Sequence, residues 1–384
     1  MNIELRGVNF FNKGAELMLQ AILSRVKKEM PDALFVMEKT VNTPRVKHLE
    51  NGIYTKANFK RGTPVKYLLA PVPSFISKRW YYIGERDIDV VLDCSGFAYG
   101  DIWGAKKAFN KLGKYIIEWK NQGKKVILLP QAFGPFSNGE LVEVMKNIVS
   151  HADLIFARDQ VSLKYLQQLN DKSKKVICAP DFTNLIEGTS QLCFNSSKCE
   201  VAIIVNSKMI DTATIKDAEA YVNLLYRIIV MIVELNHKPY FLLHEVKTDE
   251  KLAESINQKL TTKLPIVIED NPLHIKGIIS KSKAVVTSRF HGLVSCLSQA
   301  IPCLATSWSH KYEMLLQDYN YSDGLLDVHC DDELLLTKVK SILTEPSKST
   351  IIKNLRIESL KQKQLSEEMW KQVFEKMKVD SLVK

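Results

Sequence analysis

The sequence lacks the features that mark several large protein classes. Its 384 residues include seven cysteines, an odd number without Cys-x-x-Cys spacing, so neither a disulfide framework nor a zinc knuckle is indicated. Its eight histidines are dispersed, with no His-x-x-x-His or His-x-Glu pattern that has partner ligands, and we predict no metal site. We expect Cys94, Cys296 and Cys303 to be buried free thiols because small and apolar residues surround them.

Targeting signals and cofactor fingerprints are also missing. Glu4 and Arg6 stand where a signal peptide would need an apolar run, and no apolar stretch of membrane-spanning length follows. We therefore expect a soluble, cytoplasmic protein. The chain has no dinucleotide fingerprint, Walker loop or Gly-x-Ser-x-Gly elbow, which disfavours NAD, ATP and serine-hydrolase chemistry.

Positive charge is concentrated in the first half of the chain. Of a net charge of +10, residues 1–192 supply 28 Lys and Arg against 19 Asp and Glu, whereas residues 193–384 carry 25 against 24. This asymmetry indicates an anionic partner such as a lipid surface, a nucleotide sugar or a nucleic acid. Basic and aromatic residues interleave over 60–82, which suits a patch on the inner face of the membrane that grips a lipid-linked sugar; a solvated loop is the alternative.

Segments with strand-like and helix-like patterns alternate along the chain. Short apolar runs such as Asp89–Asp93 are typical of buried strands, and the apolar spacing over Lys13–Lys28 is helical. Such alternation indicates a doubly wound parallel sheet. The predicted strands are 2–8, 89–93, 125–129, 153–157, 175–178, 200–205, 239–243, 266–268, 284–287 and 300–304. The predicted helices are 13–28, 103–121, 140–150, 160–169, 221–235, one that begins near Leu293, and 353–378.

A polar, turn-rich segment at 186–198 separates two series of strands and helices. We therefore predict an α/β fold of two Rossmann-like doubly wound parallel-sheet domains, residues 1–190 and residues 199–350, that face a cleft. Residues 351–384 are predicted to form a charged helix. In two-lobed transferases such a final helix often returns to the first lobe, which is an argument by analogy.

The segment Ser288–Gly292 joins a predicted strand to a predicted helix. Ligands bind at the carboxyl ends of strands in open α/β sheets, and the free N–H groups of a following helix favour an anion. Arg289 adds a bidentate donor and His291 a titratable group, with Ser288 and Phe290 as neighbouring contacts. The structural alternative pairs Arg289 with a core acid and makes His291 a helix cap. His310 and Lys311 lie in the next polar loop, which we expect beside the first.

Arg158 follows a predicted strand of the first domain at the position equivalent to Arg289. Two arginines at facing strand ends would clamp one small polyanion. In the alternative, Arg158 is held by Asp159 or Asp153.

Further polar loops follow strands in the first domain. The first strand-helix junction combines Asn12, Lys13, Gly14 and Glu16, which suit hydroxyls or an anion, and Asn12 is also a candidate helix N-cap. Two later loops mix aromatic residues with Asp, Gln and Gly, as binding of a sugar ring requires. Their candidate residues are Ser95, Tyr99, Asp101 and Gln131, of which Asp101 is equally suited to be a base or a loop anchor.

Several of these motifs, in this order, resemble those of the polysaccharide pyruvyltransferase family. The similarity runs over about residues 3 to 315 and rests on Asn12-Lys-Gly-Ala-Glu-Leu, Ser95-Gly-Phe, Gln131-Ala-Phe-Gly-Pro, Ala157-Arg-Asp and Ser288-Arg-Phe-His-Gly followed by Gln299-Ala-Ile-Pro. The resemblance implies two Rossmann-type lobes in the GT-B arrangement. It also implies transfer of the pyruvyl unit of phosphoenolpyruvate to a sugar, as a 4,6-ketal on a hexose such as galactose, in bacterial capsule, exopolysaccharide or cell-wall synthesis.

By the same resemblance, Arg158, Arg289 and His291 hold phosphoenolpyruvate, which is a co-substrate, and no cofactor is expected. His291 is the first candidate for the acid that protonates C3, and His310 is the second. A GT-B glycosyltransferase that uses a nucleotide sugar is the main rival. A non-catalytic nucleic-acid-binding protein is the second rival, but the chain has no recognised nucleic-acid motif, and we predict no nucleic-acid partner.

Overall fold

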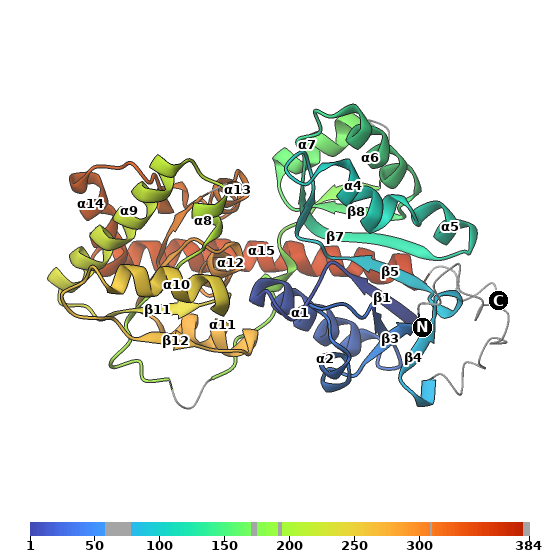
Figure 1. The fold of residues 1–384 in the computed structure, drawn as a ribbon, viewed down its shortest axis with the longest axis horizontal. Helices are drawn as coiled ribbons and strands as arrows, with labels where there is room; N and C mark the ends of the chain where they lie inside the picture. Colours follow the sequence, from blue (N-terminus) through green and yellow to red (C-terminus); the bar gives the residue numbers. More distant parts are fainter. Residues whose placement is uncertain (58–77, 170–174, 191–193, 308, 379–384) are drawn as a thin grey trace. The chain divides into compact units, whose positions relative to one another are not determined.

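The computed structural model describes residues 1–57, 78–169, 175–190, 194–307 and 309–378. The chain divides into two compact units (Figure 1). Unit 1 consists of Met1–Phe11, Met18–Pro180 and Glu367–Lys384, and unit 2 consists of Asn12–Leu17 and Asp181–Ser366. The predicted α/β fold with two parallel-sheet domains is confirmed.

Unit 1 is built on a parallel sheet with the strand order β4-β3-β2-β1-β5-β7-β8-β9, and β6 pairs with β7. The chain moves outward from β1 to β4 and then returns to place β5 on the other side of β1. The strand order therefore reverses between β1 and β5, which makes their carboxyl ends a topological switch point. The strands are β1 (Asn2–Arg6), β2 (Leu34–Met37), β3 (Ile53–Ala57), β4 (Tyr82–Gly84), β5 (Val90–Asp93), β6 (Phe97–Tyr99), β7 (Lys125–Phe133), β8 (Leu154–Ala157) and β9 (Val176–Cys178).

The helices of unit 1 follow the predicted apolar spacing, with one exception. The sequence predicts a single helix over 103–121, and this prediction is wrong, because a π-helical turn, η3 (Phe109–Gly113), interrupts it. Glycine weakens a continuous helix, and a Cβ on Gly113 would lie 3.1 Å from Val144, so glycine also permits close packing here. The helical segments are α1 (Lys13–Glu29), α2 (Arg45–Glu50), η2 (Glu85–Asp87), α4 (Gly104–Ala108), α5 (Ile116–Asn121), α6 (Gly139–His151) and α7 (Gln160–Leu169).

Unit 2 is built on a second parallel sheet with the strand order β12-β11-β10-β13-β14-β15. This is the doubly wound order of a Rossmann domain, with its switch point between β10 and β13. The strands are β10 (Val201–Ile204), β11 (Pro239–Leu243), β12 (Ile266–Ile268), β13 (Ala284–Thr287), β14 (Cys303–Thr306) and β15 (Leu325–Leu326).

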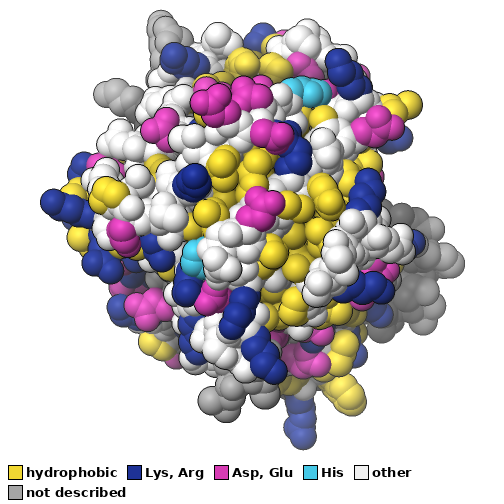
Figure 2. All heavy atoms as spheres, turned by 90° about the vertical axis from the view of Figure 1, so that its left-hand side faces the viewer, with side chains coloured by type: hydrophobic (Ala, Val, Ile, Leu, Met, Phe, Trp, Pro, Cys, Tyr) yellow, Lys and Arg dark blue, Asp and Glu magenta, His cyan; other side chains and the backbone are white. Residues whose placement is uncertain are grey.

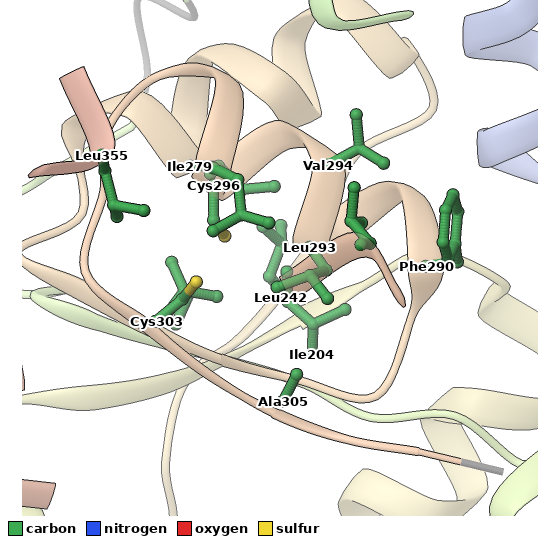
Figure 3. Packing of buried hydrophobic residues seen from close by; sticks show 14 of the residues in the cluster. Ile204, Leu242, Ile279, Phe290, Leu293, Val294, Cys296, Cys303, Ala305 and Leu355 are labelled. Atoms are coloured by element: carbon green, nitrogen blue, oxygen red, sulfur yellow. The ribbon is translucent and has the colours of Figure 1, made fainter. Parts of the chain in front are cut away.

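Two hydrophobic clusters cover the faces of this sheet. On one face Leu293 and Cys296 of α12 pack with Ile204, Leu242 and Ala305 of the strands (Figure 3). This packing fixes the start of α12 beside the switch point. The helical segments of unit 2 are η4 (Phe182–Asn184), α8 (Lys208–Asp211), α9 (Ile215–Glu234), α10 (Val246–Asn257), α11 (Pro272–Lys281), α12 (Phe290–Ser298), α13 (Lys311–Asp318), η5 (Ser322–Gly324) and α14 (Asp332–Leu343).

The final helix, α15 (Ser347–Lys378), belongs to unit 2 in its first part and to unit 1 from Glu367 onward. In unit 1, Glu367 pairs with Arg25 at 2.6 Å, and the apolar side chains of Trp370 and Phe374 are buried.

The units divide between Pro180 and Asp181, before the polar segment 186–198 that marked the boundary in the sequence. The start of α1, Asn12–Leu17, also belongs to unit 2, although the sequence prediction assigned it to the first domain.

The surface of unit 2 carries charges of both signs. On the side where α9 and α14 lie, basic, acidic and hydrophobic side chains are interspersed (Figure 2), as the near balance of charge over 193–384 leads one to expect. Cys94, Cys296 and Cys303 are buried free thiols, as predicted. Among the residues that the structure describes, no helix has the length and apolar content needed to cross a bilayer. Most of the basic and aromatic segment over 60–82 lies outside those residues.

Candidate functional site

Ser288 lies at the switch point of unit 2 and ties four elements together. Its Oγ accepts hydrogen bonds from Tyr221 at 2.7 Å and from Thr306 at 2.8 Å. Its carbonyl accepts bonds from Asn206 and Tyr312, both at 2.9 Å. Ser288 is fully buried, so it positions the junction between β13 and α12 and presents no side chain to solvent.

Arg289 follows Ser288 and is engaged by two carboxylates. Its Nε lies 3.1 Å from Asp249 Oδ2, its Nη2 lies 2.6 Å from the same oxygen, and its Nη1 donates to Glu245 at 2.9 Å. Burial lowers the pKa of the guanidinium, but Asp249 and Glu245 outweigh burial, and the net pKa is raised. The structure thus contains the alternative arrangement, in which Arg289 pairs with a buried acid. Direct contact between Arg289 and a substrate stays a prediction.

His291 lies in the first turn of α12, between Asp181 and Gly14. Its Nε2 is 3.5 Å from Asp181 Oδ2, and Asp181 is 2% exposed. Its Nδ1 would lie 2.4 Å from a Cβ on Gly14, so only glycine leaves room for the imidazole. A buried carboxylate beside one ring nitrogen orients an imidazole, as in acid-base dyads.

Two helix N-termini converge at this point. Asn12 Oδ1 accepts hydrogen bonds from the N–H groups of Gly14 and Ala15, at 3.0 and 3.2 Å, which confirms Asn12 as the N-cap of α1. The N-cap of α12, Arg289, makes no side-chain capping bond. Because Gly14 of α1 packs against His291 of α12, the positive ends of both helix dipoles lie close together. This arrangement favours an anion.

Lys13 adds a cation at the same place. Its ammonium group lies 2.9 Å from Glu16 Oε2 and 3.8 Å from Asp270 Oδ1. The structure therefore brings Asn12, Lys13, Gly14 and Glu16 together with His291 in unit 2, and we call this group, with His244 and Asp181, the His291 site.

His244 follows β11 and completes this site. Burial, together with the charges of Arg289, His291 and Lys13, lowers its pKa to about 3. The imidazole is 6% exposed, and its Nε2 has no hydrogen-bond partner among the described residues. A buried neutral imidazole among cations indicates a positive potential, and its unused nitrogen is available to a ligand.

The second loop of the predicted site lies on α13. Lys311 is 9% exposed, and its ammonium group lies 5.5 Å from the ring centroids of Phe290 and Tyr312, a cation-π arrangement. His310 precedes α13 and accepts a backbone bond from Met314. Phe290 itself is buried in the hydrophobic cluster, so its role is packing.

A second polar group lies at the switch point of unit 1, around Asp93. Its carboxylate accepts hydrogen bonds from Ser95 Oγ at 2.8 Å, Tyr99 Oη at 3.0 Å and Gln131 Nε2 at 3.0 Å. Ser95 Oγ in turn accepts a bond from Lys111 at 2.9 Å. Three residues that the sequence predicted as sugar contacts are therefore joined to one buried acid. Tyr99 is fully buried and serves as a support for Asp93.

Comparison with known proteins decides the family. Residues 12–310 match the family model described as polysaccharide pyruvyl transferase. The chain belongs to this family. It is a transferase, and the motifs at both switch points fall within the matched range. No curated protein matches the chain significantly in sequence.

Solved structures with the same fold are nucleotide-sugar enzymes of the GT-B type. HepE from Anabaena, in a complex with UDP and glucose, is 12% identical to this chain, with a TM-score of 0.59. The similarity covers 98% of this chain and 100% of HepE. The UDP-GlcNAc 2-epimerase of Methanocaldococcus jannaschii is also 12% identical, with coverages of 90% and 94% and a TM-score of 0.56. At such identity the likeness establishes the GT-B fold of this pyruvyltransferase and nothing about its ligands.

Two other predicted site residues of the pyruvyltransferase lie elsewhere in unit 1. Asp101 accepts hydrogen bonds from the N–H and the hydroxyl of Ser137, so it anchors the loop after β7, which was one of its two predicted roles. Arg158 follows β8 and is 5% exposed. Asp153 binds Lys120, and Asp159 caps α7 through Ser162. Arg158 belongs to unit 1 and Arg289 to unit 2, and the clamp between them stays a prediction.

Sequence reasoning missed Asp181, His244, Asp249 and Lys111. None of these four residues lies in a motif with a recognisable spacing. Of the four, only His244 could have been found from the sequence, because it directly follows an apolar strand-like run. Residues at the ends of such strands often bind ligands, as the sequence predicts for His291.

Proposed function

We propose that this pyruvyltransferase moves the pyruvyl group of phosphoenolpyruvate onto two hydroxyls of a sugar, as a 4,6-ketal on a hexose such as galactose. The pathway would be the synthesis of a capsular, exo- or cell-wall polysaccharide in a bacterium. Family membership supports the reaction type.

The observation that carries the proposal is the meeting of two helix N-termini at Gly14 and His291, with Lys13 and His244 beside them. Phosphoenolpyruvate carries a phosphate and a carboxylate. Helix N-termini and a buried positive potential stabilise such an anion without a metal or a nucleotide base. His244 Nε2 is available to bind it, because this nitrogen has no partner among the described residues.

The proposed chemistry begins with transfer of a proton from His291 to C3 of phosphoenolpyruvate, which turns the methylene group into a methyl group. The oxygen of one sugar hydroxyl forms a bond to C2, and its proton returns to His291. The bond between C2 and the phosphate oxygen then breaks, and phosphate leaves with the electron pair. A second hydroxyl closes the ketal at C2, and its proton goes to the departing phosphate, so atoms and charges balance.

Asp181 would position His291 for both proton transfers. A buried carboxylate 3.5 Å from Nε2 orients the ring that donates the proton. Asp181 also accepts a hydrogen bond from the N–H of Thr183, which fixes the carboxylate. We assign Asp181 a positioning role, since it acts through His291.

Release of inorganic phosphate from phosphoenolpyruvate tests the function. Purified enzyme is supplied with phosphoenolpyruvate and a panel of lipid-linked and nucleotide-linked galactose, mannose and glucose acceptors. Acceptor-dependent phosphate release is expected, and His291→Ala should abolish it while the fold persists. An active His291→Ala enzyme would remove His291 from the mechanism.

The positioning role of Asp181 has its own test. Asp181→Asn keeps the acceptor for Thr183 but removes the charge, so we expect kcat to fall at least tenfold with KM little changed, because the imidazole is no longer held for proton transfer. Asp331→Asn is the control, because Asp331 also caps a helix, α14, through Leu334. An Asp181→Asn enzyme with the kcat of the wild type would contradict the role.

A thermal-shift assay distinguishes the proposed function from its rival, a glycosyltransferase that uses a nucleotide sugar. Phosphoenolpyruvate should raise the melting temperature of this protein, and UDP should not. Stabilisation by UDP alone would favour a glycosyltransferase.

We also propose that the acceptor is lipid-linked and that the enzyme meets it at the membrane surface. The support is the excess of positive charge over residues 1–192. Flotation with anionic liposomes tests this, and binding that is absent, or insensitive to salt, would rule it out.

A further inference from the structure

Unit 1 contains a pocket of about 250 Å³ at the carboxyl ends of β1, β2 and β5. This is the switch point of that sheet, where open α/β domains bind ligands. The charged and amide side chains that line it are Arg6, Asn9, Glu38, Asn42, Asp93 and Lys111.

The two cations of the pocket are held in place by contacts within unit 1. Arg6 pairs with Glu4 at 2.7 Å and lies 5.4 and 5.3 Å from the ring centroids of Tyr115 and Trp119. Lys111 donates to Ser95 Oγ, which uses one of its three N–H groups. Burial lowers the pKa of Lys111, and Asp93 opposes this. Both donors are therefore preorganised, which reduces the entropy that a ligand must lose on binding.

The charges in the pocket balance, because Glu38 and Asp93 oppose Arg6 and Lys111. The amides of Asn9 and Asn42 add donors and acceptors. An uncharged ligand whose groups both donate and accept hydrogen bonds suits this lining. Sugar hydroxyl groups have these properties. Among the described residues that line the pocket none is aromatic, so a nucleotide base would find no ring to stack on.

We propose that this pocket binds one uncharged hexose unit of the acceptor through its hydroxyl groups, with Lys111 and Asn42 as determinants of specificity. The proposal rests on the function proposed above and names the substrate class at the acceptor side. The volume is below the range of about 300–1,000 Å³ typical of pockets for drug-sized ligands, which fits a single sugar ring.

Saturation-transfer NMR with the methyl glycosides of galactose, glucose and mannose tests the proposal on the full chain. At least one glycoside should receive saturation from the wild-type protein. Lys111→Met, which keeps the aliphatic stem, should reduce its affinity at least fivefold. Asn42→Ala should also reduce the affinity at least fivefold. It removes the side-chain amide only, because the carbonyl of residue 42 still accepts a hydrogen bond from the N–H of Phe10. Lys114→Met is the matched control, because Lys114 is exposed and does not line the pocket, and it should bind as wild type does.

Two results would overturn the proposal: no transfer to any of the three glycosides, or transfer that both Lys111→Met and Asn42→Ala leave unchanged. A thermal-shift assay with phosphoenolpyruvate on the same samples shows whether a negative result concerns the hexose pocket alone or the proposed function as well. A protein that is stabilised by phosphoenolpyruvate but binds no glycoside would refute only the hexose pocket. A protein that binds glycosides but is not stabilised by phosphoenolpyruvate would refute the proposed reaction.

Discussion

Gly14 leaves the space that the imidazole of His291 occupies. A Cβ at this position would lie 2.4 Å from Nδ1 of His291, closer than any contact of real Cβ atoms, so Gly14→Ala must displace the ring. We expect phosphate release from phosphoenolpyruvate to fall at least tenfold. Stability should change little, because alanine is a better helix former than glycine. A phosphate-release assay and a melting curve measure the two effects.

Gly139→Ala is the control for this substitution. Gly139 begins α6, and a Cβ there would meet nothing within 4 Å. Wild-type activity is expected for this variant. Full activity of Gly14→Ala would show that the position of His291 does not limit the reaction.

His244 makes the stability of the protein depend on pH. Its pKa is about 3 in the folded protein and about 6.5 when unfolded, so the unfolded chain binds more protons between these values. The stability that the neutral imidazole contributes is present above pH 6.5 and is lost as the pH falls toward 3. The expected loss is about 1.4 kcal/mol per pH unit in that range.

Urea unfolding of unit 2 at pH 7.5, 6.0 and 5.0 measures this dependence. His244→Phe removes the titrating group and keeps a ring of similar size, so its free energy of unfolding should fall less steeply between pH 6.0 and 5.0. Parallel curves for wild type and His244→Phe would mean that His244 is not neutral in the folded protein.

At the scale of elements, α10 is attached to the junction of β13 and α12 by one buried ion pair. Asp249 of α10 is fully buried, binds Arg289, and accepts hydrogen bonds from the N–H groups of Ser207 and Glu245. Asp249→Ala would leave the guanidinium of Arg289 buried without its main partner. Breaking a buried pair in this way costs about 3–5 kcal/mol, and a large drop in melting temperature is expected.

Asp332→Ala gives the comparison for an exposed pair. The side chain of Asp332 is 78% exposed and lies 2.7 Å from Nε of Arg227. Loss of such a surface pair costs about 1 kcal/mol or less. Equal destabilisation by the two substitutions would show that Arg289 does not depend on Asp249.

At the scale of the whole molecule, α15 carries the end of the chain from unit 2 into unit 1. Trp370 is 1% exposed and stacks on Phe374 with ring centroids 5.5 Å apart. Removing the indole should cost unit 1 about 3–5 kcal/mol. For Trp370→Ala we expect hydrogen exchange more than a hundredfold faster in peptides from β1 and β7, with β10 and β13 unchanged. Leu360→Ala is the control on the same helix, because Leu360 is 70% exposed. Unchanged exchange in β1 would contradict this role of α15.

Most elements of the fold could be predicted from the sequence, because apolar periodicity depends on burial and central strands such as β5, β8, β10 and β13 are buried on both faces. Strands β10 and β13 and helix α7 lie within a residue or two of their predicted ranges. The single helix predicted over 103–121 was wrong, since the packing of Gly113 against Val144 is not visible in a local pattern.

The site could be predicted only in part. The sequence by itself determined the parallel sheets, the family motifs and the strand-end position of Ser288–Gly292, because each depends on residues close together in the chain. Only the tertiary structure decided that Arg289 pairs with Asp249, that His291 lies between Gly14 and Asp181, and that Lys111 lies at the pocket of unit 1. These contacts join residues far apart in sequence, and their energies depend on distances and burial that exist only once both sheets have formed.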